Sequence, residues 1–201
     1  MTWIKNYIPS HTTTTATLAL FKSIQMGKHT LEHRVVLAPV TRYRGDENHA
    51  PTGLVTEYYS QRTTSGGLLV TEGILISDST TGVPGTNGIY TDIQVERWGH
   101  VVEAVHAKKG VIFAQLWHLG RTGSSLHRLN NKARNNAPAV VVGPSAIAAR
   151  GINHDTGEPY EVPHQLTVDE IQGLVQEHVT AAKNAIKAGF DGVEIPVCFG
   201  K

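Results

Sequence analysis

Residues Val111–Gly120 read VIFAQLWHLG, and the rest of the chain can be placed relative to this stretch. Its first half is β-branched, aromatic and apolar, a composition typical of a buried strand. An amide (Gln115), an indole (Trp117) and an imidazole (His118) follow, and Gly120 interrupts the run. Since parallel strands commonly present binding groups at their carboxyl ends, we expect a site at the end of this strand.

Two segments upstream have the same design. Val35–Thr41 (VVLAPVT) is apolar until Pro39 and ends with the hydroxyl of Thr41. Leu68–Gly73 (LLVTEG) is apolar until Thr71-Glu72-Gly73. Three strands that finish in this way predict one ligand lying across their carboxyl ends.

The groups at these strand ends suit a flat, polar ligand. Thr41 offers a hydroxyl, Gly73 a backbone N–H that no Cβ covers, and Gln115 an amide with donors and an acceptor. Such a set matches a heterocycle whose edge alternates carbonyl and N–H groups. Trp117 would form an apolar wall beside it.

Helical spacing fills the segments between the strands. Thr91 with Gln94, and Thr167 with Glu170, are capping boxes that predict helix starts. Gly110 is expected to end the first of these helices in the left-handed conformation. The expected elements, in chain order, are a hairpin over Phe21–Arg34, a strand over Val35–Val40, a helix over Gly53–Thr64, a strand over Leu68–Ile76, a helix over Thr91–Gly110, a strand over Val111–Trp117, a helix over Thr167–Gly189 and a strand over Gly192–Val197.

A long excursion separates the third strand from the last helix. Leu119–Gln165 is rich in Asn, Gly and Pro and too long for a plain connection, so we expect a lid or capping excursion. Short strands are expected within it at Ala139–Val142 and Ala146–Ala149. The helix that follows carries an apolar stripe expected to face the core, formed by Ile171, Leu174, Val175, Val179, Ala182 and Ile186.

The alternation of strands and helices predicts an α/β fold whose parallel strands are joined by right-handed crossovers. Two closures fit this pattern. One is an open doubly wound sheet, and the other is the first half, about four strands, of a (β/α)₈ TIM barrel. Both folds place their sites at the carboxyl ends of the strands, so the residues alone leave the choice open.

Composition narrows the class of protein. A net charge of +1 with interspersed signs gives no basis for a nucleic-acid partner or an acidic membrane surface. No apolar run approaches the ~20 residues of a membrane span. The single cysteine, Cys198, excludes an internal disulfide and indicates a reducing, cytoplasmic location. Met1–Leu20 is Thr-rich and is expected to be a disordered leader, followed by one domain over residues 21–201.

Several common chemistries lack their motifs. The 11 histidines show no HExxH or Cys/His spacing, so no metal site is expected. No GxGxxG follows a strand, and no GxxxxGK followed by Ser or Thr occurs, so neither a Rossmann dinucleotide site nor a P-loop is predicted. Asp155-Thr156-Gly157 matches the aspartic-protease triplet, but its polar neighbours favour a turn.

A set of motifs in a fixed order carries a family resemblance. They are LAPVTR (37–42), EYYSQR (57–62), TEG (71–73), QLWHLGR (115–121), GPSAIAARG (143–151), LTVDEI (166–171) and AGFDGVEI (188–195). From about Phe21 to Ile195 the chain closely resembles the old yellow enzymes, which are FMN-dependent NAD(P)H oxidoreductases (ene reductases) that reduce activated C=C bonds. The resemblance covers about the N-terminal half of that family's (β/α)₈ barrel and so favours the barrel closure.

The resemblance implies roles for the groups at the strand ends. The Thr41 hydroxyl would hydrogen-bond the flavin carbonyl next to the reactive nitrogen, where a donor tunes the reduction potential. The Gln115 amide would bind the pyrimidine edge, and Trp117 would face an enone-type substrate. In total it implies catalytic roles for Thr41 and Trp117, and cofactor-binding roles for Pro39, Val40, Thr41, Gly73 and Gln115.

The resemblance stops after Ile195. The family reads roughly Glu-Ile-His-x-Ala-Asn-Gly-Tyr there, whereas Pro196, Phe199 and Lys201 stand at the His, Asn and Tyr positions that hold the substrate carbonyl and donate a proton. So abrupt a change indicates a shifted or prematurely ended reading frame, and predicts a truncated form of the enzyme. The alternative is a catalytically inactive fragment or interaction remnant. Uncovered sheet edges would favour a homo-oligomer.

Overall fold

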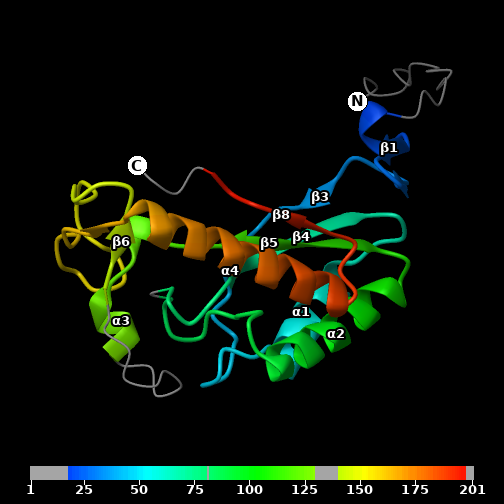
Figure 1. Ribbon diagram of the computed structural model, residues 1–201. Coiled ribbons are helices and arrows are strands. Elements are labelled where there is room, and N and C mark those ends of the chain that lie inside the picture. Colours follow the sequence, from blue (N-terminus) through cyan, green and yellow to red (C-terminus); the bar gives the residue numbers. More distant parts are fainter. Residues whose placement is uncertain (1–17, 81, 130–139, 198–201) are drawn as a thin grey trace, which may run out of the picture.

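The computed structural model describes residues 18–80, 82–129 and 140–197 (Figure 1). Its centre is a four-stranded sheet in the order β3-β4-β5-β8. The strands are β3 (Val36–Leu37), β4 (Leu68–Leu75), β5 (Val111–Trp117) and β8 (Gly192–Glu194), and all neighbouring pairs are parallel. The predicted parallel α/β architecture is therefore confirmed.

The order of the strands distinguishes the two closures left open by the sequence. It follows the chain without reversal, whereas a doubly wound sheet reverses its order at a switch point. The connecting helices α1 (Gly53–Arg62), α2 (Asp92–His106) and α4 (Val168–Lys187) share one apolar core with β4 and β5. Sequential strands and a common helical layer are the features of a (β/α)₈ barrel segment.

Trp98 of α2 lies at the middle of this core. Its side chain is fully buried, and its indole N–H donates to the carbonyl of Gly88 at 3.0 Å. The ring centroid lies 6.2 Å from that of Tyr59 on α1 and 5.5 Å from that of Phe190, just before β8. One indole thus joins α1, α2 and the approach to the last strand.

Local signals at the helix ends are confirmed with one exception. Both capping boxes, at Thr91 and at Thr167, are formed in full. After α2, however, the left-handed residue is Lys109 with φ 59°, and the prediction for Gly110 was wrong. Glycine is needed there for space, because a Cβ would lie 2.5 Å from Cγ2 of Thr63.

The outer strands are shorter than predicted. β3 spans Val36–Leu37 where Val35–Val40 was expected, and β8 ends at Glu194 where Val197 was expected. Pro39 and Pro196 lie just beyond the observed ends. Because proline has no backbone N–H, it cannot donate to a sheet ladder, which explains both early ends.

The N-terminal hairpin is confirmed. β1 (Ile24–Met26) pairs antiparallel with β2 (His29–Leu31), and Gly27 turns between them with φ 57°. The His29 ring packs against Phe113 of β5 at 6.1 Å, which fixes the hairpin to the sheet. Ala19–Phe21 form one 3-10 turn, η1, while residues 1–17 of the expected leader lie outside the described residues.

The excursion after β5 holds η2 (Gly120–Thr122), α3 (Ser125–Leu129), β6 (Val142–Gly143) and β7 (His164–Gln165). β6 pairs with β7 in parallel, so one expected short strand is confirmed near its end. The other was wrong, because Ala146–Ala149 form no strand. That the excursion acts as a lid stays a prediction.

Within the described ranges no helix could cross a membrane.

The apolar stripe of α4 departs from expectation. The helix buries the small side chains of Ala181 and Ala185 against the core, and Leu174 and Ala182 pack beside them. The four β-branched members of the stripe are exposed, with exposed fractions of 41% for Ile171, 47% for Val175, 39% for Val179 and 58% for Ile186. Helical spacing therefore identified an apolar face but not what covers it.

Candidate functional site

The TEG motif forms a β-bulge in β4. Val70 pairs with Phe113 of β5, but the next pair is Gly73 with Gln115, so β4 holds one residue more than its partner. Thr71 closes the gap, since its hydroxyl oxygen accepts from the backbone N–H of Gln115 at 3.0 Å. Bulges re-aim side chains beside active sites. Here the bulge sets the directions of Glu72 and Gly73.

Glu72 is fully buried and connects β4 to two loops. Its Oε2 accepts from the backbone N–H of Arg42 at 2.9 Å, and its Oε1 accepts from the amide of Asn87 at 3.1 Å. Burial raises the pKa of the carboxyl group, while the N–H groups of Arg42 and Tyr43 and the Asn87 amide act to lower it. The carboxyl thus fixes the loop after β3 against the end of β4.

Tyr59 of α1 holds the same residue from the helical side. Its hydroxyl accepts from the backbone N–H of Glu72 at 2.8 Å, and its side chain is 1% exposed. Burial, followed by the neighbouring charge of Glu72, raises the pKa of the phenol well above its ordinary value. Tyr59 is therefore a neutral structural anchor.

Gln115 joins β5 to β8 at the same end of the sheet. The two strands pair Gln115 with Glu194, and the Gln115 amide donates to Oε1 of Glu194 at 2.8 Å. This contact orients the amide and leaves its oxygen and second N–H for a ligand.

The Trp117 indole lies over Gly73. A Cβ on Gly73 would lie 2.7 Å from Cε3 of the indole, so only glycine leaves room for the ring. The two residues are on neighbouring strands, with Leu75 as the pairing partner of Trp117. Packing of the indole is a reason for glycine here that the sequence interpretation did not consider.

His118 follows Trp117 and is a neutral imidazole at pH 7. Burial, with a smaller contribution from His178, lowers its pKa to about 4. Its Nδ1 accepts from the backbone N–H of Gly120 at 2.9 Å, which places the ring proton on Nε2. The imidazole can thus donate from Nε2 without carrying charge.

The structure brings Thr41, Gly73 and Gln115 together, in addition to Trp117, whose indole lies over Gly73. Thr41 precedes Arg42, whose N–H is bound by Glu72, and Gly73 follows Glu72 and pairs with Gln115. The Thr41 side chain is half-buried and makes no hydrogen bond within the described residues. Pro39 and Val40 lie beyond β3 and are exposed. What these residues bind is untested, and their assignment stays a prediction.

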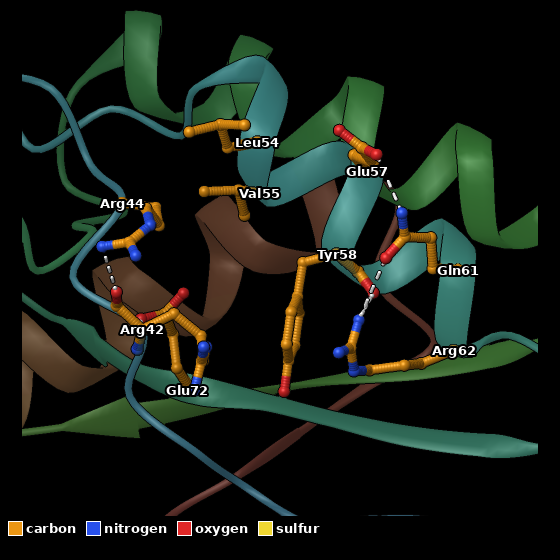
Figure 2. Close-up of a pocket in the computed structure, with 9 residues that line it drawn as sticks. All are labelled: Arg42, Arg44, Leu54, Val55, Glu57, Tyr58, Gln61, Arg62 and Glu72. Atoms are coloured by element: carbon orange, nitrogen blue, oxygen red, sulfur yellow. Dashed lines mark hydrogen bonds between the residues drawn. The ribbon is translucent and has the colours of Figure 1, made fainter.

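A polar cavity of about 200 Å³ opens on the outer side of Glu72, beneath α1 (Figure 2). Tyr58 stands within it, and the guanidinium carbons of Arg62 and Arg42 lie 3.8 and 5.2 Å from its ring centroid. Sequence reasoning missed this cluster, along with Glu72, Tyr59, Asn87 and Glu194. A glutamate inside the apolar run LLVTEG was the one visible signal.

Comparison with known proteins identifies the family to which the chain belongs. Residues 19–199 match the NADH:flavin oxidoreductase / NADH oxidase family. The chain belongs to this family. Its members are oxidoreductases of the old yellow enzyme type, and FMN with NAD(P)H as reductant is the cofactor set that the family indicates. The recognition made from the motifs is confirmed.

Individual relatives agree. The chain is 44% identical over 180 residues to "Putative 12-oxophytodienoate reductase 11" of Oryza sativa subsp. japonica, covering 90% of this chain and 48% of the relative. It is 40% identical over 176 residues to "12-oxophytodienoate reductase 2" of Arabidopsis thaliana, covering 88% and 46%. The chain therefore spans about half the length of the curated relatives it matches.

Solved structures give the same result. The old yellow enzyme homologue from Zymomonas mobilis superposes with a TM-score of 0.78 at 41% identity, covering 88% of this chain and 48% of the neighbour. Morphinone reductase superposes with a TM-score of 0.76 at 38% identity, covering 88% and 47%. Because these neighbours are TIM barrels, the sheet of this chain is part of a (β/α)₈ barrel.

Proposed function

We propose that this chain carries one side of an FMN site across the carboxyl ends of β3, β4 and β5. The observation that carries the proposal is the contact of Arg42 with Glu72, together with the pairing of Gly73 with Gln115. These contacts put a hydroxyl, a glycine backbone segment and an amide beside one another. This is the set that the edge of a flavin requires.

The residues present fit the group. The Thr41 hydroxyl has no partner among the described residues and would donate to a flavin carbonyl, and Gln115 would bind the pyrimidine edge with its remaining N–H and oxygen. Trp117 would exclude water on the substrate side. When bound, FMN supplies hydride chemistry, which is the cofactor's own.

We infer that this site serves an NAD(P)H-dependent ene reductase. The substrates would be α,β-unsaturated carbonyl compounds, which agrees with the reductase names of the relatives. Thr41 and Trp117 would then be the catalytic residues that this chain contributes. The proposal covers both NADH and NADPH as the reductant.

A second function has its own support. Pro196 stands where the resemblance places a histidine that polarises the substrate carbonyl, and proline has no side-chain donor. The other two changed positions, Phe199 and Lys201, lie outside the described residues. The alternative is therefore a truncated chain without turnover, which acts as an inactive or interaction remnant.

Flavin binding and reduction test the two functions separately. The purified chain is titrated with FMN while flavin fluorescence and absorbance are followed, and NADPH or NADH is then added without oxygen. Saturable quenching followed by bleaching supports the enzyme. Quenching without bleaching supports the inactive alternative, and no quenching contradicts the FMN site.

Two variants test the site residues themselves. Thr41→Val and Gln115→Leu should each weaken FMN binding by about tenfold, the usual cost of one hydrogen bond to a bound ligand. Thr56→Val, on α1, is the matched control and should bind FMN as the unchanged chain does. Equal binding by all three variants would contradict the assigned contacts.

A further inference from the structure

Glu72 occupies the position where the two predicted flavin contacts of β3 and β4 meet. It precedes Gly73 in the chain, and it binds the N–H of the residue that follows Thr41. Its side chain is fully buried, and its own N–H is bound by Tyr59. Among the described residues, the Glu72 carboxyl binds the backbone N–H of Arg42, while the Arg44 guanidinium donates to the Arg42 carbonyl from within the same loop.

A carboxyl group is a costly way to join buried segments. Removing an ionisable group from water is unfavourable unless hydrogen bonds compensate it, and burial does raise the pKa of this one. A connection serving stability alone could use an apolar contact at lower cost. Unlike an apolar side chain, the carboxyl has two acceptor oxygens, and these accept hydrogen bonds from Arg42 and Asn87 at the same time.

We propose that Glu72 is a positioning residue for the flavin. Its carboxyl holds the loop after β3 at the height of the β4 bulge, so that the Thr41 hydroxyl and the Gly73 backbone face the same edge of the ring. This inference rests on the FMN site proposed above. The residue acts through Thr41 and Gly73 and makes no contact with the flavin itself.

The length and acceptor oxygens of the side chain, and not its charge, are what positioning needs. Glu72→Gln keeps the length and one acceptor oxygen for Arg42. Its NH₂ group would face Asn87, whose Oδ1 is buried without a partner among the described residues and could accept after rotation of the amide. Glu72→Asp keeps the charge but is one methylene shorter, and Glu72→Leu keeps neither acceptor.

The first experiment needs no flavin. Amide hydrogen exchange is measured at Arg42, with Ile112 as internal reference because its N–H likewise donates to a side-chain carboxylate, the partly buried one of Asp191. Relative to Ile112, exchange at Arg42 should accelerate at least tenfold in Glu72→Leu and stay within threefold in Glu72→Gln. Unchanged exchange at Arg42 in Glu72→Leu overturns the proposal, and acceleration supports it.

The second experiment adds FMN to the same variants. The dissociation constant should stay within threefold for Glu72→Gln, rise about tenfold for Glu72→Asp and rise further for Glu72→Leu, whose bound-flavin absorbance should resemble that of free FMN. Glu57→Gln, which changes an exposed carboxylate on the same cavity, is the matched control. Tighter binding by Glu72→Asp than by Glu72→Gln overturns positioning by length and acceptors.

The two experiments separate the failure of this inference from that of the proposed function. If the unchanged chain takes up no FMN, the flavin site fails, and exchange at Arg42 still decides whether Glu72 fixes the loop. If the chain binds FMN and all Glu72 variants bind it equally, the flavin site stands and the role of Glu72 fails.

Discussion

The centre of the sheet and its two flanks are built from similar residues but reach different degrees of burial. Every residue of β4 is buried, and Trp98, Val101 and Val105 of α2 have no exposed surface. At the flanks, Val36 of β3 is 43% exposed and Ile186 of α4 is 58% exposed. The same aliphatic side chains are thus core in one region and surface in the other.

This difference follows from the neighbours that each region has. β4 is paired on both edges and shares the core with α1 and α2, and all of its residues are buried. β3 and β8 each pair on one edge within the described residues. The helices at the centre complete a core, while the aliphatic face of α4 is largely exposed in the part of the chain that the structure describes. Stability should therefore reside in the centre, and association in the flanks.

The sharpest test compares one truncation in each region. Trp98→Ala should lower the free energy of unfolding by about 3–5 kcal/mol, because it leaves a cavity where α1, α2 and the approach to β8 meet. Val175→Ala, on the exposed face of α4, should lower it by less than about 1 kcal/mol. Urea denaturation followed by fluorescence and circular dichroism measures both. Similar losses in the two variants would contradict the distinction between centre and flank.

Sequence patterns predicted best what is decided locally. The capping boxes at Thr91 and Thr167 and the hairpin within Phe21–Arg34 depend on residues a few positions apart, and all three are present. The placement of Gly73 and Gln115 on neighbouring strands, with Thr41 in the loop after β3, also followed, because parallel strands bring their carboxyl ends together.

What sequence patterns missed depends on partners far along the chain. Glu72 was visible in LLVTEG, but its partners Arg42 and Asn87 lie 30 and 15 residues away. Its direction is set by the register shift of β4 against β5, which no periodicity reveals. For the same reason the stripe of α4 was read as core: a helical period identifies a face without its cover.

The end of β5 belongs to the buried centre and should make stability depend on pH through His118. Its pKa of about 4 lies below that of an unfolded histidine, ordinarily 6.5. The unfolded chain therefore binds the proton first, and stability falls as pH drops from 6.5 towards 4. The loss should be roughly 1–3 kcal/mol, since a pKa difference of one unit corresponds to about 1.4 kcal/mol and the imidazole is partly accessible.

Two variants assign this pH dependence. In His118→Asn the side-chain oxygen can still accept from Gly120, but nothing titrates there, so the unfolding free energy should fall less between pH 6.5 and 4. His100→Asn, which replaces an exposed histidine of α2, should keep the original slope. Parallel pH profiles in the two variants would remove His118 as the cause.

Removal of the Tyr59 hydroxyl tests how much the contact between α1 and the backbone of Glu72 contributes to stability. Tyr59→Phe leaves the buried N–H of Glu72 without its acceptor and should cost about 1–2 kcal/mol of unfolding free energy. Tyr58→Phe, at the adjacent and partly exposed ring, should cost less than about 0.5 kcal/mol. Thermal unfolding of both variants is the measurement, and an equal shift in Tm would show that the bond to Glu72 contributes nothing.

The smallest effect on stability, and the largest on association, is expected at the β3 edge. Val36 is 43% exposed on a strand whose outer edge pairs with no other described strand, and a lysine there should hinder edge-to-edge pairing of two copies. Val36→Lys should change the unfolding free energy by less than about 0.5 kcal/mol while it raises the dissociation constant for self-association about tenfold, the cost of one lost apolar side-chain contact. Sedimentation over a dilution series measures this.

The control for that edge is a residue of equal exposure in the other region. Ile93 of α2 is 42% exposed and lies on a helix, so Ile93→Lys removes a similar amount of apolar surface without charging a strand edge. If Ile93→Lys weakens association as much as Val36→Lys does, general hydrophobicity drives it and the edge has no special role. If the unchanged chain sediments as a monomer at every concentration, the exposed apolar residues of the flanks do not cause association. The reason would be that an edge as short as Val36–Leu37 offers too few backbone groups for a second strand to pair with.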